Sequence, residues 1–355
     1  MGKPKIIAFY LPQFHPILEN DEWWGKGFTE WTNVGKALPL FKGHYQPRIP
    51  ADLGYYDLRI PEVREQQALF AKEAGIEGFC YWHYWFGHGK QLMERIFNEV
   101  LDTGKPDFPF CLGWANHSWF AKTWDKKGTD KLLIEQLYDD CEEHFNYLLK
   151  AFKDSRYIKV ANKPLFVIYD ANSLPEEYMI RLNNLVCNNG FDGICFVARF
   201  NKMCEYKLFK QKGYSYFIPE RFGYIQSSMS TFKKRLHQFK NIISRKPINC
   251  YTYEEAIPYF IDKSLDSKED IMPVLVPQWD HSPRSGYKGF ILDKPSPKYF
   301  KKHIQDVFSI LKKKEQRIVF LKSWNEWAEG NYMEPDLRWG KQYINVLREE
   351  INKFR

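Results

Sequence analysis

The stretch RIVFLKSWNEWAEG, residues 317–330, runs from an apolar segment into a turn that carries two carboxylates. Its first half is mostly apolar, as in a parallel strand that is covered on both faces. We expect a strand over Arg317–Trp324, with Glu326 and Glu329 directly after it. Gly330 helps the chain to leave the strand in a sharp turn. The stretch therefore predicts a buried strand that ends at a candidate site.

Seven similar runs precede this strand and alternate with helical patterns. Eight strands that alternate with helices predict an α/β protein with a single (β/α)8 TIM barrel, and an open doubly wound sheet is the alternative. The other strands are expected at Lys5–Pro12, Ile76–Trp85, Phe108–Asn116, Leu165–Asp170, Gly193–Phe200, Tyr214–Glu220 and Ile271–Asp280. Helices are expected at Pro61–Ala74, Gln91–Asp102, Asp139–Asp154, Pro175–Asn188, Tyr253–Ser264, Pro297–Lys313 and Lys341–Phe354.

The length of 355 residues exceeds the roughly 250 of a minimal barrel. The surplus is expected in three long loops after strands 1, 3 and 6, at Gln13–Ile60, His117–Tyr138 and Arg221–Asn249. No internal repeat or linker divides the chain, so residues 1–355 are predicted to form one catalytic barrel domain.

Composition narrows the function class. Aromatic residues make up 17% of the chain, which suits a cleft that stacks on sugar rings but also suits an aromatic core. The net charge of +8 is spread over several lysine and arginine runs, without a nucleic-acid-binding motif. These runs are expected on solvated helix faces, and binding to anionic glycans or peripheral association with a membrane remains the alternative.

Cysteine usage and hydropathy indicate a compartment. The seven cysteines include no CxxC pair, and three of them lie in strand-like runs, which favours reduced, buried thiols. The first apolar run is too short for a signal peptide, and no stretch approaches the roughly 20 residues of a membrane span. We expect a cytoplasmic protein.

Functional groups of such barrels gather at the carboxyl ends of the strands. Polar and aromatic residues occupy that position after all eight predicted strands, which predicts a cleft that binds an oligosaccharide or polysaccharide. Each side chain has a packing role as its alternative. The candidate substrate contacts are Tyr10, Gln13, His83, Trp85, Asn116, Trp119, Trp124, Tyr169, Gln278, Trp279, Trp324 and Asn325.

Glu326 and Glu329 are the candidate catalytic residues. Three residues apart, they lie on one side of a helical turn but on opposite faces of a strand, so the transition from strand to turn can direct both into the barrel mouth. Paired carboxylates in an aromatic pocket can acquire different pKa values and act as acid and base, as glycosidic bond cleavage requires. A salt-bridged surface turn is the alternative.

Other chemistries have weaker support in the sequence. His83, His88 and His117 could form a metal site with Asp125 or Asp170, but no HxH or HExxH spacing supports it, so we expect no metal. No GxSxG elbow, Walker loop or GxGxxG loop occurs, so we expect neither a serine nucleophile nor a cofactor.

Seven motifs spread along the chain carry a family resemblance. They are AFYLPQFHP (8–16), WWGKGFTEWTNV (23–34), GHYQPRIPADLGYYDLR (43–59), GIEGFCYWHYWF (75–86), LGWANHSWFAKTWD (112–125), VPQWDHSPR (276–284) and SWNEWAEGNYMEPD (323–336). With these motifs nearly the whole chain resembles the WbsX-like proteins, which are similar to glycoside hydrolase family 99. The name WbsX carries a glycosyltransferase label and an association with bacterial surface-polysaccharide synthesis. The resemblance to family 99 implies a (β/α)8 barrel that cleaves α-mannosides with retention.

The resemblance also implies individual roles. The residue that matches the base, which deprotonates the sugar 2-hydroxyl, is Glu326, and the residue that matches the acid is Glu329. Ala328 stands where family 99 commonly has histidine, so the positioning of the acid differs here. The sugar specificity does not carry over, because the long loops differ.

Three functions are therefore compared. The first is a glycoside hydrolase or transglycosylase that acts on a bacterial surface polysaccharide or its precursor. The second is a glycosyltransferase of O-antigen or capsule synthesis, which would need an activated sugar donor, although no nucleotide-binding loop or clear DxD motif is present. The third is a glycan-binding module, which would not need paired acids. The sequence leaves the sugar, the linkage, the anomeric outcome and the oligomeric state open.

Overall fold

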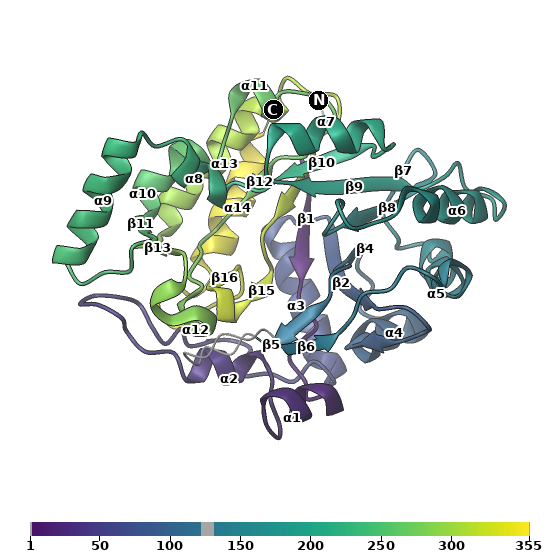
Figure 1. Cartoon of the computed structure of the whole chain (residues 1–355), viewed down its shortest axis with the longest axis horizontal. Coiled ribbons are helices and arrows are strands. Elements are labelled where there is room, and N and C mark those ends of the chain that lie inside the picture. The colour runs from purple at the N-terminus through teal and green to yellow at the C-terminus, as the bar shows by residue number, and fades with distance from the viewer. Residues whose placement is uncertain (1, 122–130, 355) are drawn as a thin grey trace.

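The computed structural model describes residues 2–121 and 131–354, and its centre is a parallel eight-stranded barrel (Figure 1). The strands follow the spatial order β10-β9-β8-β4-β2-β1-β14-β12, in which β1 pairs with both β2 and β14. The bounds of these strands are Lys5–Tyr10 (β1), Gly78–Trp85 (β2), Phe110–Trp114 (β4), Lys163–Ile168 (β8), Cys195–Phe200 (β9), Tyr216–Pro219 (β10), Val274–Leu275 (β12) and Ile318–Leu321 (β14).

A short parallel bridge joins the two ends of this order. The N–H of Phe217 on β10 donates to the carbonyl of Asp270 at 2.9 Å, and Phe217 in turn accepts from the N–H of Met272 at 2.9 Å. Because these bonds link β10 to the segment that enters β12, the sheet is a nearly closed barrel. The prediction of a barrel is confirmed, and the open doubly wound sheet is wrong.

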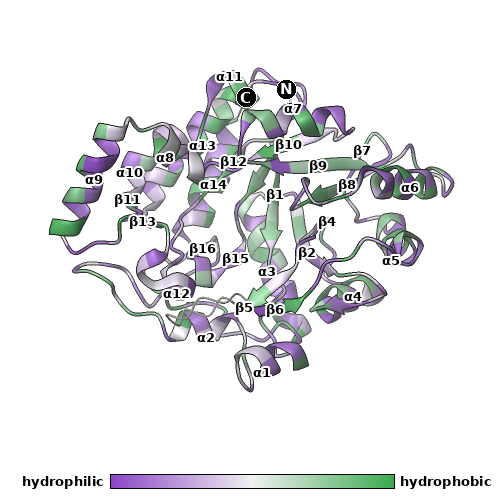
Figure 2. Ribbon diagram, viewed as in Figure 1, coloured by the Kyte–Doolittle hydropathy of each residue, from purple (hydrophilic) through white to green (hydrophobic). Residues whose placement is uncertain are grey.

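Helices cover the outside of the barrel, and the apolar strands lie at its centre (Figure 2). Most predicted helices agree with the structure within three residues. The long helices are α3 (Pro61–Ala74), α4 (Glu94–Thr103), α5 (Cys141–Lys153), α6 (Glu176–Cys187), α7 (Met203–Gln211), α9 (Thr231–Ile243), α13 (Pro297–Leu311) and α14 (Gln342–Lys353). None of the helices in the described part of the chain is both long and apolar enough to span a bilayer.

The three long connections contain more structure than loops. The connection after β1 holds α1 (Leu18–Trp24) and α2 (Glu30–Gly35), and the one after β4 holds strands β5 (Trp119–Ala121) and β6 (Lys131–Ile134). Residues 221–249 were expected to be a loop, but they form α8 (Phe222–Ser227) and α9. Helix α9 carries apolar residues at helical spacing, but they face solvent and not the barrel.

The remaining elements are short. The predicted helix Tyr253–Ser264 is interrupted, with α10 and η1 in place of one continuous helix. These elements are β3 (Gln91–Leu92), β7 (Lys159–Val160), β11 (Cys250–Thr252), α10 (Tyr253–Ala256), η1 (Ile257–Tyr259), α11 (Lys263–Asp266), α12 (Ser282–Ser285), η2 (Gly286–Lys288), β13 (Ile291–Asp293), β15 (Asn325–Glu326), η3 (Trp327–Glu329) and β16 (Asn331–Tyr332).

Candidate active site

A cavity of about 720 Å³ opens at the carboxyl ends of the barrel strands. Residues from all eight strand ends contribute to its wall, together with Glu30 from α2 and Arg284 from α12. The lining side chains that carry charge are Glu30, Asp170, Arg199, Glu205, Glu220, Arg284, Lys322, Glu326 and Glu329. The cavity is therefore a polar space with ionisable groups on opposite walls, as a catalytic cleft requires.

Both candidate catalytic acids lie on a tight turn after β14. Glu326 ends β15, η3 follows, and Gly330 reverses the chain into β16, where Asn331 pairs with Glu326. Gly330 has a φ of 56°, a conformation that glycine adopts without strain. A Cβ at this position would lie 2.7 Å from the Cβ of Asp280. Position 330 therefore favours glycine for two physical reasons, the left-handed turn and the close packing of Asp280 against it.

Glu329 is held in its ionised form. Its carboxylate forms an ion pair with Arg284, and the Nε2 atom of His281 lies 3.6 Å away. Burial alone would raise the pKa of Glu329, but Arg284 and His281 outweigh it and hold that pKa well below its ordinary value. Arg284 also pairs with Glu30 at 2.9 Å, so one guanidinium bridges two carboxylates.

Glu326 has the opposite electrostatic state. Its Oε2 atom accepts from the Ser323 hydroxyl at 2.8 Å and from the Asn331 amide at 3.4 Å, and no ion pair to it is present among the described residues. Burial raises the pKa of Glu326 to about 7, and the negative charge of Glu329 adds to the rise. The two neighbouring carboxylates therefore differ, since Glu329 is ionised at neutral pH whereas Glu326 titrates near pH 7.

A second charged group, formed by Glu220, Arg199 and Lys322, also lines the cavity. Glu220, after β10, accepts from Arg199 at 2.5 Å and from Lys322 at 2.9 Å. Burial opposes ionisation, but these two cations hold the pKa of Glu220 at about 2. The group thus carries one more positive than negative charge, and it offers the cavity hydrogen-bond donors.

Aromatic rings form much of the remaining wall. Trp82 and Tyr84 come from β2, and Tyr169 follows β8, where Arg199 lies 4.0 Å over its ring centroid. Trp119 contacts Tyr84 edge-on, with 5.3 Å between the ring centroids. Flat rings beside hydrogen-bonding groups form a surface that suits the apolar faces and hydroxyl edges of sugars.

Six of the predicted residues line this cavity, and seven do not. Trp124 lies outside the described residues. The residues that line it are Gln13, Trp119, Tyr169, Trp279, Glu326 and Glu329. The residues behind the wall are Tyr10, His83, Trp85, Asn116, Gln278, Trp324 and Asn325, and each of them is buried.

Strand alternation explains three of these seven. On β2, Trp82 and Tyr84 face the cavity, so His83 and Trp85 must point the other way. His83 lies 2.9 Å from His144 on α5, and Trp85 donates to Asp140 at 3.0 Å. Tyr10 on β1 likewise points outward. Its hydroxyl donates to Gln67 on α3 at 2.7 Å.

The other buried residues connect the site to its surroundings. Asn325 exchanges two hydrogen bonds with the backbone of Leu11, at 2.8 and 3.0 Å, which joins the turn of Glu326 and Glu329 to the end of β1. Asn116 bonds in the same way to both backbone groups of Asp170, at 2.8 Å each. The indole of Trp324 is fully buried and packs 5.5 Å from Phe79, measured between ring centroids. These side chains hold the cavity wall in place and do not line the cavity themselves.

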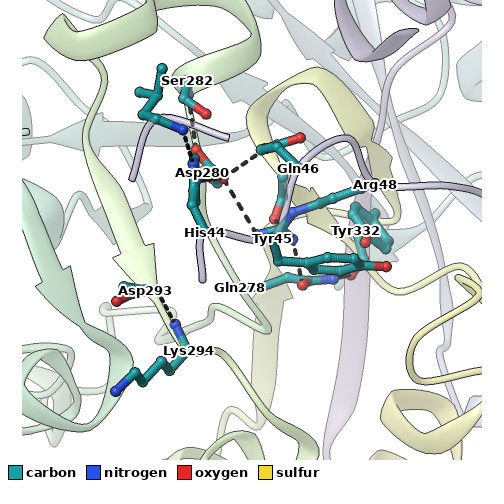
Figure 3. Close-up of polar contacts among 12 residues, drawn as sticks. His44, Tyr45, Gln46, Arg48, Gln278, Asp280, Ser282, Asp293, Lys294 and Tyr332 are labelled. Atoms are coloured by element: carbon teal, nitrogen blue, oxygen red, sulfur yellow. Dashed lines mark hydrogen bonds and ion pairs between the residues drawn. The ribbon is translucent and has the colours of Figure 1, made fainter. Parts of the chain in front are cut away.

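Gln278 belongs to a buried polar network behind the turn (Figure 3). Arg48 donates to Gln278 at 2.5 Å and to the carbonyl of Gly330 at 3.0 Å. Asp280 accepts from His44 at 2.9 Å and from Gln46 at 2.7 Å. The N–H of Asp280 donates to the carbonyl of Glu329 at 2.7 Å. The loop at residues 44–48 is therefore joined to the turn of Glu326 and Glu329 through charged and polar side chains.

Several cavity residues were not predicted. Trp82 and Tyr84 share the aromatic run of β2 with the residues chosen, and nothing in that run distinguishes its two faces. Arg199, Glu220 and His281 stand at predicted strand ends, so their position was a usable signal. Glu30, Arg284 and Lys322 come from separate parts of the chain, and no local pattern marks them.

Within residues 2–121 and 131–354, no group of three or more His, Cys, Asp or Glu side chains converges on one point. His83 is buried beside His144, and His88 pairs with Asp139 at 2.9 Å. Asp125, a candidate ligand, lies outside these residues.

Comparison with known proteins identifies relatives along the whole chain. The model of the family described as Glycosyltransferase WbsX matches residues 6–347. The protein WxcX of Xanthomonas campestris pv. campestris is 34% identical over 361 residues, which cover 98% of this chain and 50% of WxcX. The chain thus spans about half the length of the curated relatives it matches.

Solved structures with the same fold include a carbohydrate-cleaving enzyme. The GH99 endo-alpha-mannosidase from Bacteroides thetaiotaomicron, in complex with BIS-TRIS-Propane, has a TM-score of 0.63 at 16% identity, and the match covers 99% of this chain and 97% of that one. A glycoside hydrolase-like protein has a TM-score of 0.59 at 15% identity, with 99% and 94% coverage. At these identities the likeness establishes the shared barrel fold.

Proposed function

The chain belongs to the family described as Glycosyltransferase WbsX, and on that basis we propose that it is a carbohydrate-active enzyme that cleaves or transglycosylates a glycosidic bond. The substrate is a bacterial surface polysaccharide or its precursor. Glu326 and Glu329 act as its acid/base pair. The observation that carries the proposal is that these two carboxylates line one cavity and differ in electrostatic state. Cleavage of a glycosidic bond needs one group that donates a proton and one that accepts a proton.

We propose that Glu326 holds the proton before the substrate binds, because burial raises its pKa to about 7. The ion pair with Arg284 keeps Glu329 ionised, whereas Glu326 lies beside neutral donors. The roles that the resemblance implies are the reverse, with Glu326 as the base toward the sugar 2-hydroxyl and Glu329 as the acid. For that order, substrate binding must move the proton to Glu329 and weaken its contact with Arg284.

The substrate contacts follow from the lining of the cavity. We propose that Trp82, Tyr84, Trp119, Tyr169 and Trp279 stack on sugar rings, and that Gln13 binds hydroxyl groups. The wall also holds Arg199 and Lys322, whose N–H groups point to the same carboxylate and can donate to further ligand oxygens.

Incubation of the protein with surface polysaccharide from the producing strain tests the proposal. Fragment analysis by mass spectrometry should show new reducing ends or transfer products. Glu326→Gln and Glu329→Gln should each abolish them while glycan binding persists. Undiminished cleavage by both variants would exclude this acid/base pair, and binding without turnover in the wild-type protein would favour the glycan-binding alternative.

An aryl glycoside of the released sugar then distinguishes the two proton orders. A good leaving group needs no protonation, so it restores activity to the variant that lacks the acid but not to the variant that lacks the base. Recovery of Glu326→Gln alone would support Glu326 as the acid. Recovery of Glu329→Gln alone would support the order that the resemblance implies.

A glycosyltransferase is the second candidate, because the family description names that activity. A transferase would form product only when an activated sugar donor is present. Mass spectrometry of reactions with and without nucleotide sugars or lipid-linked sugars makes the distinction. Product that depends strictly on a donor would replace the hydrolase proposal.

A further inference from the structure

Helix α9 exposes its apolar residues to solvent. It stands at the edge of the molecule, beside β11 and α10, and its ribbon combines hydrophobic and hydrophilic turns (Figures 1 and 2). The residues of its apolar stripe are Phe232, Leu236, Phe239 and Ile243, with exposed fractions of 76%, 57%, 61% and 67%. Their spacing of i, i+4, i+7 and i+11 places all four on one face of the helix.

The opposite face of α9 is polar and is the face that packs against the protein. Asn241 is buried, and its amide donates to the carbonyls of Pro247 and Cys250 at 3.1 and 2.9 Å. His237 stacks on Tyr251, with 4.2 Å between ring centroids and an interplanar angle of 4°. These contacts fix the rotation of α9, so the exposure of the apolar stripe is built into the fold.

In α13, a helix of similar length, the apolar face points inward, which is the reverse of α9. There the apolar residues Phe300, Ile304 and Val307 are buried against the barrel. A surface helix of a protein that acts alone normally resembles α13. A contiguous apolar face that points outward indicates a surface that is covered by a partner or a membrane.

The charges around the stripe identify the partner. Residues 221–253 contain no aspartate or glutamate. Lys233, Lys240 and Arg235 are exposed on α9 itself, and Arg245 follows it. By helical spacing, Lys233 and Lys240 flank one side of the stripe and Arg235 the other. An apolar face between rows of cations is the pattern of a helix that lies in the interface of an anionic bilayer.

We propose that α9 is a membrane-docking helix that binds anionic lipid surfaces through its apolar stripe and the cations beside it. Phe232, Leu236, Phe239 and Ile243 enter the boundary between headgroups and acyl chains, and the lysine and arginine side chains bind lipid phosphates. The inference goes beyond the proposed function, and its test involves no turnover, so either can fail without the other.

Docking through α9 also places the membrane near the cavity wall. Tyr251, on which His237 stacks, lies 5.5 Å from Phe290 between ring centroids, and Phe290 lies 5.4 Å from Phe222. Phe222 in turn lies 4.2 Å from Trp279, and both line the cavity. A continuous row of packed rings therefore joins the docking helix to the site.

Vesicle co-sedimentation of the full chain tests the proposal. The probe is phosphatidylcholine vesicles with or without phosphatidylglycerol, at low and high salt. We expect binding to the anionic vesicles only, weakened by salt. Phe232→Ser with Phe239→Ser should weaken binding at least about tenfold. Lys233→Gln with Lys240→Gln should weaken it by roughly ten- to thirtyfold.

Matched variants on other helices provide the controls. Leu69→Ser with Ile180→Ser removes apolar side chains of comparable exposure from α3 and α6, and Lys150→Gln with Lys153→Gln removes two charges from α5. Both control variants should bind as the wild-type protein does. Circular dichroism melts show whether each variant folds, and all these substitutions are at surface positions.

Three results would overturn the proposal. One is the absence of binding to phosphatidylglycerol vesicles at low salt. Another is binding that the two stripe substitutions leave unchanged. The third is a dimer, seen by analytical ultracentrifugation without lipid, that Phe232→Ser with Phe239→Ser dissociates, because a second copy would then be the partner of the stripe.

Discussion

The cavity wall and the layer directly behind it are built from the same residue types but differ in what they face. Glu326 and Glu329 face open space, whereas Glu334 and Asp280 are buried among donors. Glu334 accepts from Trp327 and Gln67, both at 2.6 Å. Acid beside tryptophan thus lines the cavity in one layer and is enclosed by hydrogen-bond donors in the next.

The same division runs through a single strand. Trp82 faces the cavity, whereas Trp85, three residues later, is buried and stacks on His144 with 4.7 Å between ring centroids. Substitutions in the front layer should therefore change activity, and substitutions in the rear layer should change stability. Five predictions test this separation.

The largest effect is expected for the catalytic acids. Glu326→Gln or Glu329→Gln should lower turnover by roughly 10²- to 10⁴-fold, because each removes one proton transfer. The free energy of unfolding should hardly fall at pH 7 for Glu326→Gln, whereas Glu329→Gln also removes a partner of Arg284 and should lower it. Initial rates on the native polysaccharide together with urea unfolding check both parts. A variant that loses stability in proportion to activity would show that the front layer is structural too.

The matching substitution in the layer behind the cavity wall is Asp280→Ala. It leaves Arg48 and the N–H groups of His44 and Gln46 without their carboxylate, which should lower the free energy of unfolding by roughly 3–5 kcal/mol. Activity should fall as well, because Asp280 holds the backbone of Glu329. Denaturant unfolding measures the loss. A stable variant would mean that the network of Figure 3 does not support the turn.

The two tryptophans of β2 form a matched pair. Trp85→Ala should lower the free energy of unfolding by roughly 3–5 kcal/mol through the cavity it leaves. Trp82→Ala should cost less stability and should mainly raise KM, since it removes a ring from the cavity wall. Thermal unfolding and Michaelis–Menten kinetics are compared for both variants. Equal losses of stability with unchanged KM would remove the distinction between the layers.

Arg284→Gln should shift the pH profile of activity. Loss of the guanidinium lets the pKa of Glu329 rise toward its ordinary value or above it, because burial is no longer opposed. Where ionised Glu329 is required, the acid limb of kcat/KM moves upward by roughly one pH unit or more. Arg284→Lys, which keeps the charge, is the control. An unmoved acid limb would show that the ion pair does not govern the active form.

The smallest effect concerns the pH dependence of stability. Burial raises the pKa of Glu326 to about 7, so the folded wild-type protein binds this proton more tightly than the unfolded chain. The stabilisation of the folded state by this bound proton is fully present below the ordinary pKa of glutamate and is lost as pH rises through 7. Glu326→Gln, which cannot ionise, should therefore be more stable than wild type at pH 8, with a difference that shrinks toward pH 4. Urea unfolding at both pH values provides the comparison, and a constant difference would contradict it.

Much of the fold could be predicted from local sequence alone. Helix α3 was predicted at its observed bounds, because Pro61 begins it and Gly75 ends it in the left-handed conformation. The strands were recognisable because both of their faces are buried, which makes them apolar throughout. That same property concealed which side chains of β2 face the cavity, since an aromatic run such as FCYWHYW is equally apolar in both registers.

The sequence by itself determined the alternation of strands and helices, the rim at the strand ends, and the acidic turn with its glycine. These depend on residues near one another in the chain, so their physical causes can be read locally. Only the tertiary structure decided which side chains meet in the cavity. Arg284 and Glu329 are 45 residues apart and Glu30 is farther still, and barrel closure brings them into one ion-pair network. Protonation of Glu326 and exposure of the stripe on α9 depend in the same way on what packs around them, because burial and charge are properties of the folded surroundings.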